Sequence, residues 1–173
     1  VHMADTPTLT DRVLKGDVDL ALCSPPDAGA ELYYEPLFKE PFAVLLPEGH
    51  PLSRKTAIAA HDFREHRLLV TSAACPYRKK LEMTLKEAGN VPTDVMEIGS
   101  MTALKFYVES GLGIALMPVI ALEPLPRGTV VRPLCEDLSI DMTFGMLYTK
   151  TGFPFTRAAS KLYRFFKEEM SAH

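Results

Sequence analysis

The chain has 173 residues, of which 47% are hydrophobic and 24% are charged, and its formal net charge is -3. This composition is enough to bury a core and suits one domain or two small lobes. No apolar run approaches the roughly 20 residues of a membrane helix, and the basic residues are scattered among acids, so we expect neither membrane insertion nor DNA binding by this chain alone. Three dispersed cysteines, Cys23, Cys75 and Cys135, do not suit a disulfide scaffold, which favours a reducing, cytoplasmic location.

The first quarter of the chain predicts one helix and three strands. A helix over residues 8–16 is indicated by Leu9 and Val13, which share one face at helical spacing. Strands are predicted at residues 18–23, 32–38 and 42–46. We expect the turn around Pro41 to separate the last two.

In the rest of the chain, short buried strands alternate with helices. The predicted order is strand 68–70, helix 76–88, strand 95–98, helix 102–110 and strand 114–117. This alternation is typical of an α/β protein whose sheets are mostly parallel. Two late strands, at 130–131 and 142–148, precede a final helix over 156–170. Its expected core positions are Leu162, Phe165, Phe166 and Met170.

The segment Gly111-Leu112-Gly113 lies between a predicted helix and a predicted strand. A dinucleotide-binding glycine loop has the opposite order, because it follows a strand and opens a helix. The sequence therefore excludes a phosphate loop here. We interpret both glycines as turn residues, with Gly111 ending the helix in a left-handed conformation.

Several segments, taken in order, carry a family resemblance. Residues 9–22 read LTDRVLKGDVDLAL, residues 35–37 read EPL, residues 47–52 read PEGHPL, and residues 108–118 read VESGLGIALMP. With this order and these separations, nearly the whole chain resembles the effector-binding domain of LysR-type transcriptional regulators.

The resemblance implies an α/β fold of two Rossmann-like lobes joined by two crossing strands, as in type II periplasmic-binding proteins. Lobe I would hold residues 1–46 plus 147–173, and lobe II would hold residues 47–146. A small effector would bind in the cleft between the lobes. On this template, the chain lacks the N-terminal DNA-binding domain and the first strand and helix of lobe I.

The resemblance also places the lobe II wall of the effector site at two strand-to-helix turns, residues 72–75 and 99–102. Amides at a helix start carry partial positive charge and suit an anion or a polar head group. Ligand contacts are expected from Ser72, Ala73, Cys75, Gly99, Ser100, Met101 and Thr102, with Leu46 on the first crossing strand bordering the cleft. The alternative is that the three hydroxyls only cap their own helices.

Three other features each allow two interpretations. Arg78 lies in the first turn of a helix, an unfavourable place for a cation unless an anion is near. It either indicates an acidic effector or is an exposed arginine on a solvated face. Cys75 at the same helix start is a reactive redox sensor or a small residue that fills the turn. The group at residues 61, 62, 65 and 66 could hold a metal, but it lacks a further ligand of evident position, so we expect a polar helix and no metal.

The function implied by the resemblance is ligand sensing without catalysis or a cofactor. Binding of the effector would modulate DNA binding and transcription, DNA being reached only through the separate N-terminal domain. A homodimer or tetramer is expected. The alternatives are a free-standing solute-binding protein of the same fold and an enzyme built on it. The absent export leader and the free thiols disfavour the first, and the absence of a nucleophile elbow or a distinct carboxylate pair disfavours the second.

Overall fold

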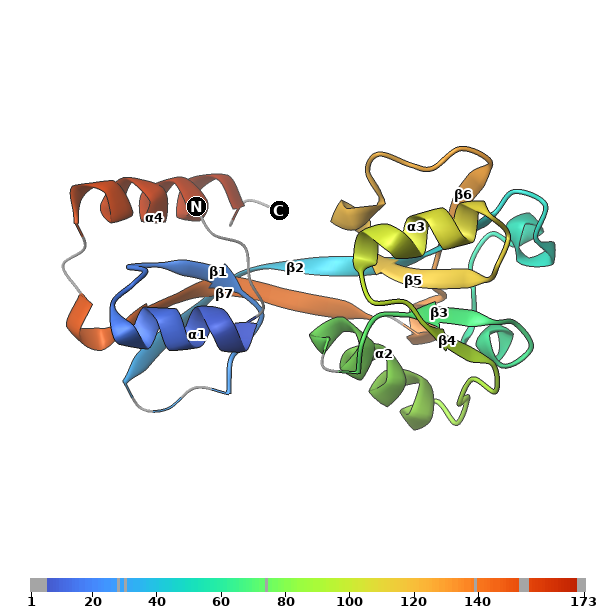
Figure 1. Ribbon diagram of the computed structural model, residues 1–173, viewed down its shortest axis with the longest axis horizontal. Coiled ribbons are helices and arrows are strands. Elements are labelled where there is room, and N and C mark those ends of the chain that lie inside the picture. The colour runs from blue at the N-terminus through green and yellow to red at the C-terminus, as the bar shows by residue number, and fades with distance from the viewer. Residues whose placement is uncertain are drawn as a thin grey trace. The chain divides into compact units, whose positions relative to one another are not determined.

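The computed structural model describes residues 6–27, 29, 31–73, 75–138, 140–152 and 156–170. The chain divides into two compact units, of which unit 1 holds residues 1–39 and 143–173 and unit 2 holds residues 40–142. Two strands, β2 (Leu32–Pro47) and β7 (Asp141–Thr149), each run from one unit into the other (Figure 1). The boundaries expected from the sequence, 46/47 and 146/147, lie later on both strands. Strand β2 already pairs with strands of unit 2 from Phe42 onward, which accounts for the earlier division.

Unit 1 is built around α1 (Thr6–Lys15), β1 (Ala21–Cys23), part of β2, part of β7 and α4 (Arg157–Met170). Strand β1 pairs antiparallel with β7, with Ala21 opposite Leu147. The predicted first helix is confirmed, because Leu9 and Val13 pack with Ala21 and Leu147 in one buried cluster.

The final helix differs from its prediction. Leu162 and Phe165 were expected in the core, but they are 43% and 54% exposed. The buried residue of α4 is Ala159. Polar contacts also attach α4 to β2, since Tyr163 Oη donates to Glu35 Oε2 at 2.7 Å and Lys167 Nζ lies 2.6 Å from Glu35 Oε1. The prediction is therefore wrong for Leu162 and Phe165. Phe166 is half-buried, and the side chain of Met170 lies outside the described residues.

Unit 2 contains a mixed sheet in the order β6-β2-β5-β3-β4. Strand β3 runs parallel to both of its neighbours, whereas β2 runs antiparallel to β5 and β6. The expectation of mostly parallel sheets is therefore wrong for the described strands. The bounds are β3 Leu68–Val70, β4 Val95–Glu97, β5 Ile114–Pro118 and β6 Thr129–Pro133, with helices α2 (Pro76–Glu87) and α3 (Met101–Glu109). Short 3-10 turns occupy the connections.

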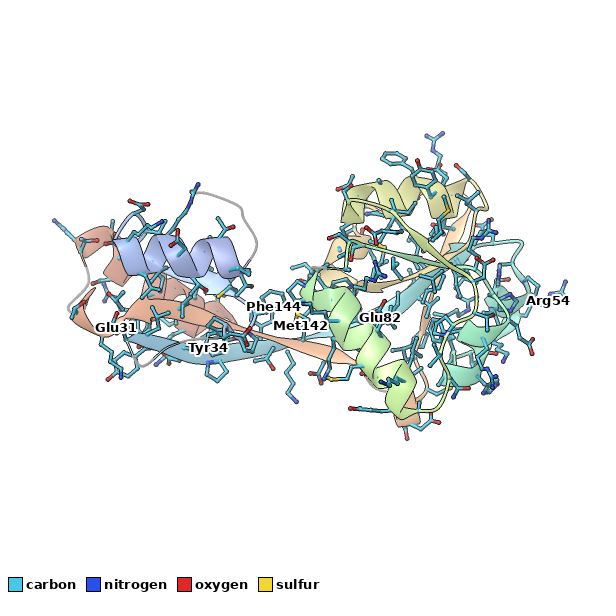
Figure 2. All side chains as sticks on the ribbon, turned by 60° about the horizontal axis from the view of Figure 1, so that its bottom comes forward. Glu31, Tyr34, Arg54, Glu82, Met142 and Phe144 are labelled. Carbon is cyan, nitrogen blue, oxygen red and sulfur yellow. The ribbon has the colours of Figure 1, made fainter. Side chains whose placement is uncertain are left out.

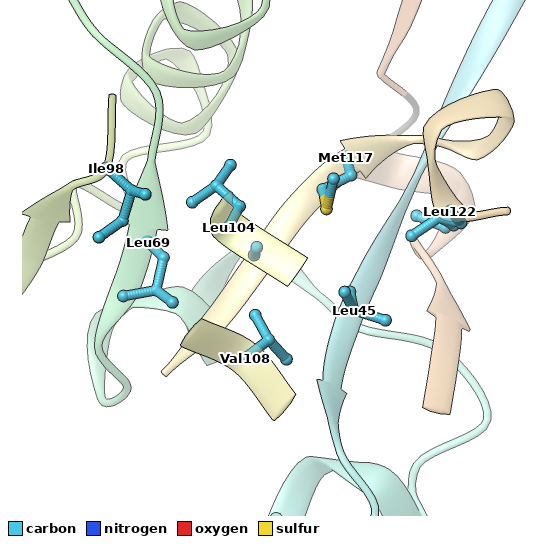
Figure 3. Packing of buried hydrophobic residues seen from close by; sticks show 9 residues of the cluster. Leu45, Leu69, Ile98, Leu104, Val108, Met117 and Leu122 are labelled. Atoms are coloured by element: carbon cyan, nitrogen blue, oxygen red, sulfur yellow. The ribbon is translucent and has the colours of Figure 1, made fainter. Parts of the chain in front are cut away.

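The core of unit 2 forms where α3 packs on the sheet. Leu104 and Val108, one helical turn apart, meet Leu69 of β3, Leu45 of β2 and Met117 of β5 (Figure 3). Each of these five residues is at most 1% exposed. The helix α2 likewise buries Leu81 and Leu85, which are four residues apart on one face, whereas Ala88 lies beyond its end and is exposed.

Strand β2 is one element of 16 residues, where the sequence predicted two strands interrupted near Pro41. The fixed φ angle of proline is compatible with an extended strand. Its missing N–H matters only at a position where a neighbouring strand needs a hydrogen-bond donor. The ladders of β2 with β5 and β6 begin at Phe42 and Ala43, just after Pro41. The proline therefore precedes these ladders and does not break the strand.

The two glycines of the 111–113 segment have different roles. Gly111 follows α3 with a φ of +77°, which confirms it as the helix end. Gly113 has no such conformation, but a Cβ at this position would lie 2.6 Å from the carbonyl oxygen of Arg67. It is therefore a site of close backbone approach, and the prediction of two turn residues holds only for Gly111.

Candidate functional site

The two predicted ligand turns begin side by side at one edge of the unit 2 sheet. Strands β3 and β4 are parallel, with Val70 opposite Glu97, and the N–H of Ile98 donates to Val70 O at 2.7 Å. The turn 72–75 then leads into α2 and the turn 99–102 into α3. The carboxyl ends of parallel strands are where α/β proteins commonly bind ligands.

The turn 72–75 is closed by its backbone. The N–H of Cys75 donates to Ser72 O at 2.9 Å, and Cys75 is the N-cap of α2 without a side-chain capping bond. Within the described part of the chain, the half-buried hydroxyl of Ser72 has no hydrogen-bond partner, and Ala73 is exposed. Cys75, and not Ser72, is therefore the N-cap of α2, and no other described residue bonds to the Ser72 hydroxyl.

The turn 99–102 contains one capping hydroxyl and one that does not cap. Ser100 Oγ accepts the N–H of Ala103 at 3.1 Å, so the alternative role as a cap holds for this residue. Thr102 lies in the first turn of α3, is exposed, and has no side-chain partner among the residues that the structure describes. Gly99 is also exposed, whereas Met101 is half-buried. Ser72 and Thr102 are thus the hydroxyls whose donors and acceptors are not already used.

Two hollows of unit 2 reach these turns. A crevice of about 10 Å³ is lined by Thr71, Tyr77, Arg78, Met101 and neighbouring apolar side chains. That volume holds about one water molecule. A larger groove of about 570 Å³ runs along α3, and Met101 and Thr102 both line it.

Leu46 does not lie with the other predicted site residues. In the sheet register, Phe42 is opposite Pro118, at the end of β5, whereas Leu46 lies four residues further along β2 and pairs with Val130. Because β5 and β3 are parallel, Leu46 lies toward the opposite end of the strands from the turns, and it is fully buried. The β2 side chain at the turn edge is Phe42, whose ring centroid lies 5.4 Å from that of Tyr77.

Arg78 fits neither interpretation drawn from the sequence. Its side chain is only 16% exposed, so it does not lie on a solvated face. Its Nε donates to Glu82 Oε1 at 2.7 Å, and its Nη1 donates to Thr71 O at 2.9 Å and to Glu97 Oε2 at 2.5 Å. The hydrogen bonds that Arg78 donates to Glu82 and then to Glu97 raise its pKa despite its burial. The anion that this cation requires is supplied by the protein.

Part of this arrangement is visible in the sequence. Arg78 and Glu82 stand four residues apart on one helix, a spacing that brings side chains together. Figure 2 labels Glu82 on α2. The bond to Glu97 had no such signal, because these residues are 19 positions apart and meet only through the register of β3 and β4.

The cysteines and the 61–66 group show no assembled centre. All three cysteines are free thiols. Cys23 is 3% exposed and belongs to the core of unit 1, and burial raises its pKa to about 11. In the described ranges, no three His, Cys, Asp or Glu side chains are placed to hold a metal ion.

Asp62 is an internal capping residue and does not lie on an exposed polar helix. Its carboxylate is 7% exposed, accepts Lys55 Nζ at 2.6 Å and accepts the N–H of Ala59 at 3.0 Å. Burial alone would raise the pKa of Asp62, but these two hydrogen bonds outweigh it and lower the pKa. His61 beside it is exposed, as expected.

Known proteins with similar sequences identify the family of this chain. A family profile described as the LysR substrate binding domain matches residues 1–171. The chain belongs to this family. The HTH-type transcriptional regulator YtlI of Bacillus subtilis is 32% identical to this LysR substrate-binding domain over 165 residues, which cover 94% of the chain and 52% of YtlI. The chain thus spans about half the length of the curated relatives it matches. These relatives are named as transcriptional regulators and not as enzymes.

Solved structures show the same fold. The effector-binding domain of QuiR in complex with shikimate has a TM-score of 0.84 at 20% identity, covering 98% of this chain and 80% of that one. The BenM effector-binding domain with its effector benzoate has a TM-score of 0.85 at 17% identity, covering 96% and 76%. The type II periplasmic-binding-protein-like architecture expected from the sequence is confirmed. Among the described helices of this LysR substrate-binding domain, none is both long and apolar enough to span a membrane.

Proposed function

We propose that this LysR substrate-binding domain is the ligand-sensing part of a transcriptional regulator, and that a small effector binds against the 72–75 and 99–102 turns of unit 2. Occupation of the site favours one conformation of the domain, and this preference changes how a separate DNA-binding domain engages its operator. The expected residues are Ser72, Ala73, Cys75, Gly99, Ser100, Met101 and Thr102. The fully buried Leu46 is omitted.

The observation that carries the proposal is the meeting of the two turns at the carboxyl ends of β3 and β4. Two helices begin there, and the hydroxyls of Ser72 and Thr102 are not engaged with other described residues. Backbone amides at helix starts favour negatively charged or oxygen-rich groups. A bound polar head group could therefore take up hydrogen bonds from both hydroxyls.

The effector class is a small organic acid or a similarly oxygen-rich metabolite. QuiR and BenM were solved with shikimate and benzoate, which makes these two compounds the natural first members of a ligand screen. Arg78 Nε and Nη1 already bond to two carboxylates, and we propose that the amides and hydroxyls of the turns recognise the acidic group. A ligand that binds only the folded state raises the melting temperature, which makes a thermal-shift screen of metabolites the first experiment.

The decisive test combines Ser72→Ala with Thr102→Ala in the full-length regulator. Effector-dependent transcription should be lost, while DNA binding without effector should persist. Thr56→Ala is the matched control, because Thr56 is an exposed hydroxyl elsewhere in unit 2. Unchanged induction in the double variant, at wild-type melting temperature, would refute the assignment of the turns.

The regulator is further proposed to act as a homodimer or tetramer and to reach DNA only through its DNA-binding domain. A role in transcription places it in the cytoplasm with its operator. Light scattering of the full-length protein across a concentration series measures the association. A monomer at all concentrations that support operator binding would contradict this part of the proposal.

A further inference from the structure

A single side chain connects the two proposed ligand turns. Thr71, whose carbonyl accepts from Arg78 Nη1, is the residue between β3 and the 72–75 turn. Glu97, whose carboxylate accepts from the same nitrogen, is the last residue of β4 and stands just before the 99–102 turn. Glu82 fixes the guanidinium from α2 itself. Three elements therefore meet at Arg78.

The chemistry of the guanidinium makes this connection a geometric constraint. Its donors lie in one rigid plane, so acceptors that bond to it are held at fixed positions relative to one another. The Arg78 side chain is 16% exposed, and its three bonds reach Thr71, Glu97 and its own helix. Displacement of one turn relative to the other would therefore break one of these bonds.

The carboxyl end of strand β4 is held by the bond between Glu97 and Arg78 and by Ile98, whose N–H donates to Val70 O and whose side chain is buried. The three residues of β4 are all exposed, and the described ladders pair it only with β3. At the amino end of β4, Arg67 Nε donates to both carboxylate oxygens of Asp94, at 3.1 Å to Oδ1 and 3.0 Å to Oδ2. The strand pair β3–β4 thus has one arginine–carboxylate link at each end, and only the Arg78 link lies at the ligand turns.

We propose that Arg78 is a positioning residue of the effector site, which sets the separation of the 72–75 and 99–102 turns through Thr71 and Glu97. The inference rests on the proposed function, since it assigns Arg78 a role at that same site. Arg78 does not contact the effector. Arg78 Nε and Nη1 already bond to Glu82, Thr71 and Glu97, so an anionic ligand could take these donors only by displacing one of those partners.

Glu97→Gln separates these two roles. The amide keeps the size of the side chain and an oxygen acceptor, but it removes the charge that holds Arg78. If Arg78 positions the turns, the variant loosens both of them and weakens binding there. If Arg78 is instead a direct anion ligand, the variant frees it and strengthens binding. Asp94→Asn is the matched control, because it breaks the corresponding link of the same strand pair at the opposite end.

The first measurement is the amide ¹⁵N–¹H spectrum of the 173-residue chain. Glu97→Gln should move the signals of Ser72 and Ala73, across the strand boundary, as well as those of Gly99 and Ser100. Asp94→Asn should leave all four in place, even if its melting temperature falls as far. Shifts in Glu97→Gln that stay within β4 would overturn the proposal.

The second measurement titrates inorganic sulfate, with ionic strength matched by sodium chloride, and follows the same amides. Positioning predicts that Glu97→Gln lowers the affinity at the turns about tenfold or more, as loss of a residue that orients ligand-binding groups commonly does. Equal or tighter binding would overturn it. If sulfate moves no wild-type turn amide while Glu97→Gln shifts both turns, Arg78 still positions them, and it is the anion-binding role of the turns that fails.

Discussion

Gly113→Ala should destabilise unit 2 although the backbone of Gly113 is in no special conformation. The new Cβ would lie 2.6 Å from Arg67 O, and relief to ordinary contact at 3.4 Å requires a movement of about 0.8 Å, the difference of the two distances. The same oxygen accepts the N–H of Ile114 at 3.0 Å, where β3 and β5 begin to pair. Overpacking costs about 1–3 kcal/mol and loss of that hydrogen bond about 1 kcal/mol, so we expect a loss of about 2–4 kcal/mol.

Gly111 provides the matched comparison, since it lies two residues away and is a glycine for a different reason. Its φ is +77° and no atom lies within 4 Å of an added Cβ. Gly111→Ala should therefore cost only the left-handed backbone penalty of about 1–2 kcal/mol, and Gly111→Asn should recover part of it because Asn tolerates this conformation. Urea unfolding followed by circular dichroism measures all three. Equal stability of Gly113→Ala and wild type, or no benefit of Asn over Ala at Gly111, would refute the reasoning.

Two further predictions concern titration and thiol reactivity. Asp62→Asn should lower the free energy of unfolding by about 2 kcal/mol at pH 7, since charge-assisted hydrogen bonds are lost. The folded pKa of Asp62 is lowered, so its contribution is present above the unfolded value near 4 and is lost as pH falls through the folded value. The difference between wild type and variant should therefore shrink below about pH 4, and an unchanged difference at pH 3 in urea titrations would count against the Asp62 bonds. In the native chain, a disulfide reagent at pH 8 should react with Cys75 and Cys135, which are half-buried, before Cys23, whose thiol is buried and whose pKa is raised to about 11. The reference rate is that of Cys23 in the Cys75→Ser, Cys135→Ser double variant unfolded in urea. If Cys23 of the native chain were labelled at that rate, its burial would be contradicted.

The elements that the sequence predicted well are those whose hydrophobic pattern is complete within one short segment of chain. The stripe of Leu104 and Val108 defines the buried face of α3 without reference to the sheet beneath it. In α4 the pattern also marks an apolar face, but a repeat of hydrophobic residues does not say what covers that face. Leu162 and Phe165 are accordingly exposed. The prediction that β2 is two strands was wrong for a related reason. The effect of Pro41 depends on where the neighbouring strands begin to pair, and the local sequence does not contain that information.

The case of Arg78 separates the physical rule from the identity of the partner. A cation in the first turn of a helix is unfavourable unless an anion lies near it, and this rule correctly indicated an anion. The sequence could not tell whether that anion belongs to a ligand or to the protein. Glu82 is visible four positions away, whereas Glu97 reaches Arg78 only because β3 and β4 align Val70 with Glu97. An unfavourably placed charge therefore indicates a ligand site only when the neighbouring strands are known and supply no counter-charge.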